Sequence, residues 1–254
     1  MRNNLFILTV IAFSFFFKGN LYSETLEIQS SEVGIEKKKS QIKFSGDVVA
    51  KDEFGNILQS NNAVYSKTKD LLESFGNTII TTSENYKIEG QNFLFDNKNK
   101  IIKTDYPATI VDVDGNNISV EMLNYNSIKN IIFSRGNVVL TDKNSNNFKF
   151  TEVYIDEKKK KIIGSDAKLF FNDNDFKDNP KNNPRVFANS VSIDSDDISI
   201  QKGVITYCGF RDGDKCPPWE IQAKKIKHNN AKKTVYYENA ILKVYDFPIL
   251  YLPR

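Results

Sequence analysis

Alternating apolar and polar residues form short runs that recur along the chain. A run opens after a small residue at Gly46, Gly76, Ala108, Gly136 and Ala167, so the gaps between openings are 30, 32, 28 and 31 residues. Each opening run is followed by a second run with an aromatic or aliphatic cluster, at 63–66, 93–96, 123–126 and 153–156. Self-similarity at this period is typical of stacked supersecondary units.

Polar turns separate the runs and indicate how the runs connect. The segments KTKD, NKNK, SIKN and EKKKK follow the second runs, and their Asn, Asp, Lys and Ser content suits tight hairpins. An apolar doublet such as Ile101–Ile102 then begins the next run. No sustained helical stripe occurs after the N-terminal segment. The pattern predicts an all-β protein built of two-strand repeats of about 30 residues.

The N-terminus has the pattern of a signal peptide. Arg2 precedes an apolar run from Leu5 to Phe17, and the charged sequence starts at about Glu24. As a helix the run would span only about 20 Å, less than the roughly 30 Å of a bilayer core. We therefore expect residues 1–23 to be a signal peptide and 24–254 to form an exported domain, with a permanent transmembrane anchor as the alternative. Because no Cys follows the run directly, no lipoprotein anchor is expected.

Charge argues against a nucleic-acid partner. The formal net charge is +3, and removing residues 1–23 takes away Arg2 and Lys18, which leaves +1. Binding to duplex nucleic acid needs a concentrated basic face. Local lysine runs at 37–39, 158–161 and 224–227 remain. They are typical of solvated hairpin tips and protected strand edges, and docking of lipid phosphates or a negatively charged partner is the alternative.

The sequence offers little catalytic chemistry. Cys208 and Cys216 flank a turn-rich segment, and in an exported chain this pair suggests a disulfide, formed locally or with another segment. A metal site is not expected from two Cys and the single His228. The usual hydrolase, metalloprotease and phosphate-loop motifs are missing, and carboxylates such as Asp112 and Asp114 suit turns better than glycoside hydrolysis. We expect no enzyme and no cofactor.

Several segments resemble a known family. The runs IKFSGDVV from Ile42, YPATI from Tyr106 and FSRGNVVL from Phe133 are similar to the organic-solvent-tolerance (OstA-like) family of lipopolysaccharide transport proteins. The run VITYC from Val204, PPWEIQA from Pro217 and the segment 240–253 resemble the periplasmic domain of the LptD family of lipopolysaccharide-assembly proteins. In that family the segment 206–254 would lead toward an outer-membrane β-barrel. The chain stops at Arg254, so we expect a fragment, or alternatively a stand-alone module.

The resemblance implies an open antiparallel β-jelly-roll that encloses a hydrophobic groove for the acyl chains of lipopolysaccharide. In the family, positions matching Ile28, Ile110 and Tyr125 face the groove, and repeat symmetry extends the set. The expected lining residues are Ile28, Val48, Tyr65, Phe95, Ile110, Tyr125, Val138 and Ile155. If these side chains instead fill a closed sandwich, the chain has a structural core there.

The resemblance also implies partners and a compartment. The N-terminal strand near Leu26 to Ile28 would pair with a periplasmic bridge protein like LptA, and a plug lipoprotein like LptE would join if a barrel is present. In the family a Cys matching Cys208 links this domain to the barrel, whereas a local bond to Cys216 is the simpler hypothesis here. The expected location is the periplasm, associated with the outer membrane. Alternatives are a stand-alone bridge component, and an exported β-solenoid lyase or adhesin with parallel strands.

Overall fold

The fold is known from a computed structural model, which describes residues 26–172, 183–194, 197–208, 217–229, 231–232 and 234–253. The signal peptide predicted at 1–23 lies outside the described residues, as does most of the segment between Phe171 and Arg185. The strands are β1 Glu27–Gln29, β2 Glu32–Glu36, β3 Gln41–Lys51, β4 Ile57–Ser66, β5 Leu71–Thr81, β6 Lys87–Gln91, β7 Leu94–Asp96, β8 Ile101–Thr104, β9 Ala108–Val111, β10 Asn117–Val120, β11 Leu123–Asn126, β12 Ile131–Thr141, β13 Asn147–Asp156, β14 Lys161–Phe170, β15 Arg185–Ile193, β16 Asp197–Thr206, β17 Trp219–Asn229, β18 Thr234–Val244 and β19 Phe247–Leu252.

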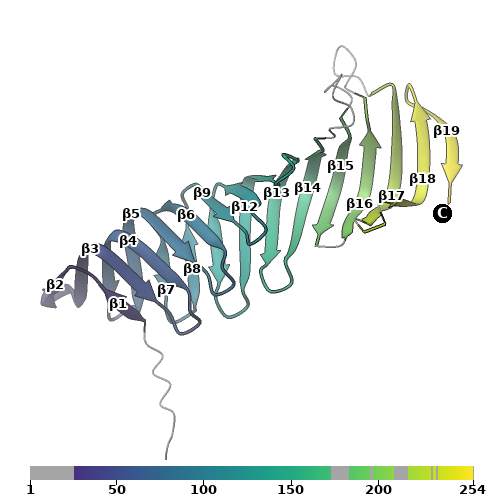
Figure 1. Cartoon of the computed structure of the whole chain (residues 1–254). Helices are drawn as coiled ribbons and strands as arrows, with labels where there is room; N and C mark the ends of the chain where they lie inside the picture. Colours follow the sequence, from purple (N-terminus) through teal and green to yellow (C-terminus); the bar gives the residue numbers. More distant parts are fainter. Residues whose placement is uncertain are drawn as a thin grey trace, which may run out of the picture.

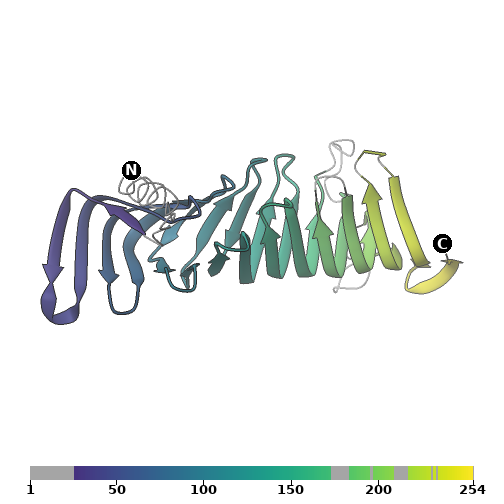
Figure 2. The same cartoon turned by 90° about the horizontal axis from the view of Figure 1, so that it is seen from below.

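The strands run up and down along one elongated molecule (Figures 1 and 2). Each of the described strand pairs is antiparallel, and the pairs join 19 strands into one continuous sheet. The all-β, antiparallel prediction is therefore confirmed. A β-solenoid would need parallel strands between its coils, so this strand arrangement contradicts the solenoid alternative. Within the described ranges, no helix has the length and apolar character that a membrane crossing requires.

An irregularity near the middle of the long strands β3, β4, β5 and β12 bends the sheet back on itself. In β3 the register shifts between Ser45 and Val48, where Gly46 and Asp47 both have positive φ, and in β12 it shifts between Arg135 and Val138, where Gly136 has positive φ. An extra residue at a bulge turns the following side chains to the other side. Both halves of a strand thus present their apolar residues to one interior. In β12, Ile132, Val138 and Leu140 are buried, whereas residues 135–137 between them are exposed.

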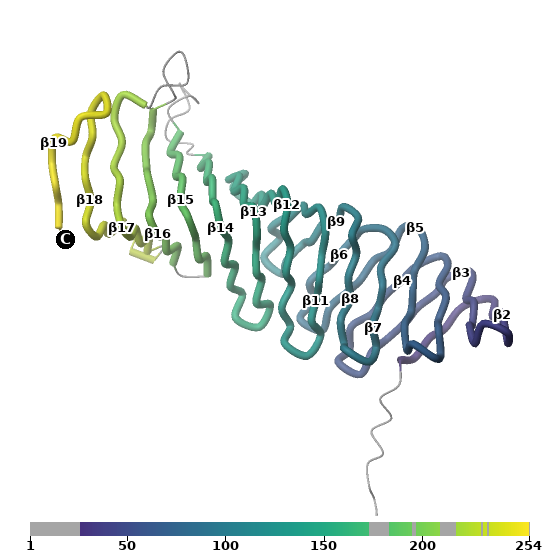
Figure 3. Tube along the Cα trace, turned by 180° about the vertical axis from the view of Figure 1, so that it is seen from behind, coloured from purple at the N-terminus to yellow at the C-terminus, as the bar shows by residue number. Residues whose placement is uncertain are grey.

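The bend divides the sheet into two facing halves. We call them the β6 half, which contains β6, β9 and β10, and the β7 half, which contains β7, β8 and β11. Figure 3 shows the two halves as overlapping layers in the N-terminal part, whereas β14 to β19 stand side by side. The arrangement agrees with the predicted open jelly-roll.

Two series of turns connect the strands, and each series recurs every 30 residues. Turns at the ends of the β6 half occupy 52–56, 82–86, 112–116 and 142–146, and turns at the ends of the β7 half occupy 67–70, 97–100, 127–130 and 157–160. In the first series an Asp accepts backbone bonds: Asp52 Oδ1 lies 2.8 Å from the Asn56 amide nitrogen, and Asp112 and Asp142 repeat the bond. Such Asx turns explain why Asp and Asn recur at this spacing.

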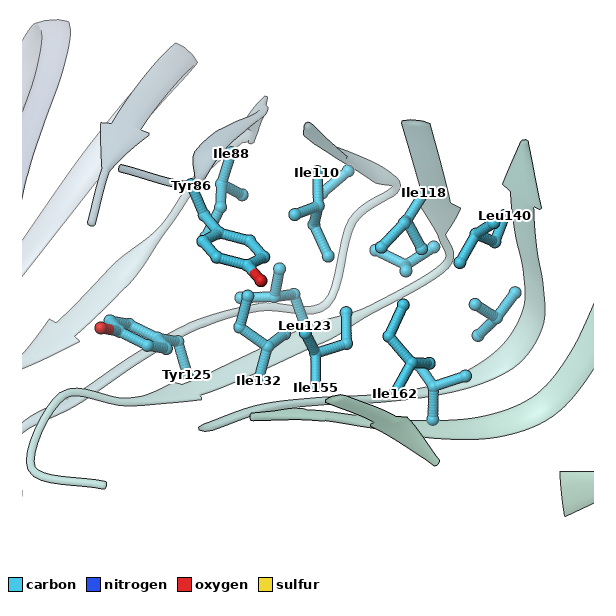
Figure 4. Packing of buried hydrophobic residues seen from close by; sticks show 14 of the residues in the cluster. Tyr86, Ile88, Ile110, Ile118, Leu123, Tyr125, Ile132, Leu140, Ile155 and Ile162 are labelled. Atoms are coloured by element: carbon cyan, nitrogen blue, oxygen red, sulfur yellow. The ribbon is translucent and has the colours of Figure 1, made fainter. Parts of the chain in front are cut away.

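Cross-strand pairing aligns apolar side chains into rows along the interior. One row in the β6 half passes through Ile28, Ala50, Leu58, Ile80, Ile88, Ile110, Ile118, Leu140, Phe148, Leu169, Val186, Ile205, Ile221, Leu242 and Leu250. A row in the β7 half passes through Tyr65, Leu72, Phe95, Ile102, Tyr125, Ile132, Ile155, Ile162, Ile193 and Ile198, and continues to His228 and Val235. Figure 4 shows parts of both rows facing each other.

Candidate functional site

The structure brings the eight predicted lining residues onto one interior. Tyr65, Phe95, Tyr125 and Ile155 lie 30 residues apart in one row of the β7 half, as repeat symmetry predicts. Five of the eight are 0% or 1% exposed, so they pack within a filled core. Tyr65 and Ile28 are only partly buried and pack against that core. No lipid-sized cavity opens beside these residues in the described part of the chain, and their role as a groove stays a prediction.

One part of the repeat alignment was wrong. Counted from the openings at Gly46, Ala108 and Gly136, Ile110 would be equivalent to Val48 and Val138, but it lies in the row of Ala50 and Leu140. The equivalent of Val48 and Val138 at 30-residue spacing is Ala108. The other units have a glycine at this bend, whereas this unit has Tyr106 followed by Pro107. Without a glycine as a marker, the opening at Ala108 was aligned with those glycines, although Tyr106 is the residue that corresponds to them.

Contacts between the two series of turns close the interior over its N-terminal part. The Lys100 ammonium lies 2.9 Å from the Glu53 carboxylate, and the Asn130 amide donates to the Ser83 hydroxyl at 3.0 Å. The third such contact joins Lys160 Nζ and Asp114 Oδ1 at 3.6 Å. Partners in all three contacts are 46 or 47 residues apart, so each repeat adds one contact. We call this line of contacts the seam.

A buried polar cluster lies beneath the middle of the seam. The Tyr125 hydroxyl donates to Asn56 Oδ1 at 3.2 Å and accepts from the Asn130 amide at 3.3 Å. Glu157 is 2% exposed, and this burial raises the pKa of its carboxyl to about 7, with a smaller contribution from the charge of Glu84. Its polar neighbours Thr82, Tyr125 and Asn130 favour the charged form and so lower its pKa.

The interior opens where the seam ends. A cleft of about 640 Å³ lies between the turn 143–146 and the strands β15 to β18. Its floor consists of side chains from the two interior rows and their neighbours, chiefly Val186, Ile198, Ile200, Ile205 and Ile226. We call it the C-terminal cleft. Its volume falls within the range of about 300–1,000 Å³ that is usual for small-molecule sites.

The rim of the C-terminal cleft is polar. Lys143, Asn144, Tyr207 and His228 line it together with the exposed part of Val235, which is 40% exposed. An apolar floor with a polar rim suits an amphipathic ligand whose chains are apolar and whose head is polar. The rows that contribute to the floor of the cleft continue into the closed core.

Sequence reasoning did not identify the C-terminal cleft. The register places His228 between Ile198 and Val235 in the interior row. Alternation within 226–228 could have indicated this, because Ile226 and His228 lie two residues apart on one face. The opening itself depends on the spacing between the two sheet halves.

The structure describes one of the two cysteines of the predicted disulfide. Cys208 is partly buried, whereas Cys216 lies outside the described residues. Among the described residues, therefore, Cys208 has no disulfide partner, and the bond to Cys216 stays a prediction. The Cys208 carbonyl accepts from Arg185 Nη1 at 3.1 Å, which fixes the backbone next to the cleft residue Tyr207.

Comparisons with known proteins give little independent support. No protein family model matches the chain, and no curated protein matches it. Among solved structures the chain is similar to LptH from Pseudomonas aeruginosa, described as the LptA homologous periplasmic component of the lipopolysaccharide transport device, with 14% identity and a TM-score of 0.26 over 56% of this chain and 82% of that chain. A likeness this distant carries no argument about function, so the interpretation rests on the residues of this chain.

Proposed function

We propose that this protein carries lipopolysaccharide in the periplasm and shields the acyl chains of its cargo from water. The observation that carries the proposal is the C-terminal cleft, where two long apolar rows emerge from a closed core into an open site with a polar rim. The segments that resemble the OstA-like family support the choice of lipopolysaccharide over other lipids.

The physical basis is burial of methylene groups. Transfer from water is worth about 0.8 kcal/mol per methylene, so a chain of about a dozen methylenes would gain up to about 10 kcal/mol in a dry site. Two residues of the cleft keep apolar surface accessible, since Ile205 is only partly buried and Val235 is 40% exposed. A lipid chain in the cleft would therefore lie against a preformed apolar surface rather than create one.

The finer proposal is that the chain is an LptD-like periplasmic domain at the outer membrane. The segment 217–253, which carries that resemblance, continues the sheet as β17, β18 and β19 and lies at the far end from β1 (Figure 1). An LptA-like bridge protein would pair with the N-terminal edge formed by β1 and β2, and a plug lipoprotein like LptE would join through a barrel. The alternative is a stand-alone bridge component, because a bridge domain could bind its neighbours through the same two ends of the sheet.

Photo-crosslinking tests the proposal. A photoreactive amino acid replaces Val235 or Ile205, which line the C-terminal cleft, and Tyr154, which is 49% exposed on the outer face, serves as the control position. We expect purified lipopolysaccharide to crosslink at the two cleft positions and not at Tyr154. An excess of phospholipid should not abolish the crosslinks. No crosslink from either cleft position would contradict the proposal. If phospholipid abolished the crosslinks as well as lipopolysaccharide itself does, the cargo would be lipids in general rather than lipopolysaccharide.

A further inference from the structure

Hydrogen bonds connect neighbouring turns within each series. In the β7 half the Ser127 amide donates to the Lys100 carbonyl at 2.9 Å, and the Glu157 amide donates to the Asn130 carbonyl at 3.0 Å. In the β6 half the Ser83 amide donates to Asn56 Oδ1 at 2.9 Å. Because such bonds couple successive turns, the turns of the β7 half form one continuous series.

The contacts across the seam are of a different kind. Glu53 with Lys100, Ser83 with Asn130, and Asp114 with Lys160 meet through side chains. Parting the two halves at the seam breaks these side-chain contacts, whereas parting the sheet anywhere else breaks a ladder of backbone hydrogen bonds. The seam is therefore the boundary of the core that opens most readily.

The seam weakens toward the C-terminal cleft. At its N-terminal end the Lys100 side chain is only 10% exposed and the ion pair with Glu53 measures 2.9 Å. At the other end Lys160 and Asp114 are 50% and 55% exposed and lie 3.6 Å apart. The next turn of the same series, 142–146, has parted from the β7 half and lines the cleft. The cleft is thus a place where the seam is already open.

The opposite side of the interior can act as a hinge. Gly46, Gly76 and Gly136 lie at the mid-strand bends with φ of 72°, 78° and 104°. Glycine adopts such angles without strain and tolerates changes in them better than other residues. Bends in this position let the two sheet halves move apart at the seam while the strand ladders stay intact.

We propose that the seam is a gate, whose opening starts at the C-terminal cleft and lets an apolar chain pass along the interior rows between the closed core and the cleft. This inference rests on the lipid-binding function proposed above. Opening exposes the apolar core to water, so the gate stays closed until an apolar chain replaces the lost contacts across the interior. The ligand therefore drives its own passage.

A disulfide lock across the seam tests the gate. The lock is Ser83→Cys with Asn130→Cys, and the control is Thr151→Cys with Ser165→Cys, whose hydroxyls lie 3.1 Å apart on neighbouring strands β13 and β14. Both pairs are made in a background in which the two natural cysteines are serine. Folding of every variant is checked by circular dichroism, and each bond is verified by peptide mapping.

Two reporters read the position of lipopolysaccharide. A photoreactive residue at Val235 reports the cleft, and p-azidophenylalanine at Phe95, a small change from phenylalanine, reports the closed core. We expect the seam lock to reduce the Phe95 crosslink at least about tenfold while the Val235 crosslink persists, and reduction of the bond to restore the Phe95 crosslink. The control lock should leave both crosslinks unchanged.

Each other outcome has a distinct meaning. A Phe95 crosslink that persists in the oxidised seam lock would overturn the gate, because the lipid would reach the core without parting the seam. A Val235 crosslink with no Phe95 crosslink in any variant, reduced or oxidised, would also overturn the gate and leave the lipid-binding proposal standing. Loss of both crosslinks in the unlocked protein would contradict the proposed function itself.

Discussion

Replacing Glu157 by glutamine should stabilise the protein at alkaline pH and leave it almost unchanged at acidic pH. The Glu157 side chain is buried, and this burial raises its pKa to about 7 from 4.5, although the neighbouring Thr82, Tyr125 and Asn130 side chains lower it. The folded protein therefore binds a proton at Glu157 more tightly than the unfolded chain does. Between these two pKa values, stability falls as pH rises, because the folded state must release a proton that the unfolded state has already lost.

The size of the effect follows from the two pKa values. The rise from 4.5 to about 7, at about 1.4 kcal/mol for each pKa unit, corresponds to a penalty on the order of 3 kcal/mol above pH 7. Below pH 4.5 the penalty is absent, because Glu157 is protonated in both states. Glutamine has nearly the same shape and carries no charge, so Glu157→Gln removes the penalty without leaving a cavity.

Urea unfolding of wild type and Glu157→Gln at pH 5, 6, 7 and 8.5 measures the effect. The free energy of unfolding of the variant should exceed that of wild type by up to about 3 kcal/mol at pH 8.5 and by little at pH 5. Glu152→Gln is the matched control, since Glu152 is an exposed glutamate in the neighbouring strand β13. A difference between Glu157→Gln and wild type that does not change with pH would refute the reasoning.

Two further predictions concern packing in the interior. Gly164→Ala should destabilise the protein by about 1–3 kcal/mol in chemical unfolding, because the new methyl would overlap the Phe150 ring. Gly34→Ala is the control, since the nearest atom to its new methyl lies 3.9 Å away, and it should change stability by less than about 0.5 kcal/mol. Equal effects of the two substitutions would show that the overlap with Phe150 is not the cause. Ile110→Ala should lower the free energy of unfolding by about 2–5 kcal/mol, because Ile110 is 0% exposed in a filled core. Ile163→Ala is the control, since Ile163 is 46% exposed, and it should lower the free energy of unfolding far less. A small loss of stability in Ile110→Ala would indicate an open groove at this position.

Local pattern explains why much of the fold was predictable. Strand side chains alternate between two faces, so the apolar positions around Ile102, Ile132 and Ile162 identified their strands and their common face. Asp and Asn at the turns, as in Asp112 and Asn116, supply their own side-chain hydrogen bonds. Both signals depend on residues close together in sequence, which is why the two-strand repeat could be recognised without a structure.

The candidate site was harder to predict because long-range geometry decides it. Glu53 meets Lys100 and Ser83 meets Asn130 only because the mid-strand bends bring the two series of turns together. Neither residue type nor local spacing distinguishes these polar turn residues from solvated ones. The C-terminal cleft depends likewise on where the two sheet halves separate, and the floor residue Ile226 has the same local pattern as residues of the closed core.

The sequence by itself determined the strands, their turns and the side of each strand that is apolar, because alternation and turn chemistry are local properties. Only the tertiary structure decided which apolar residues are covered. Ile110 and Leu250 lie in the same interior row, yet Ile110 is 0% exposed and Leu250 is 49% exposed. Burial of a side chain on a sheet depends on what packs opposite to it, and that partner comes from a distant part of the chain.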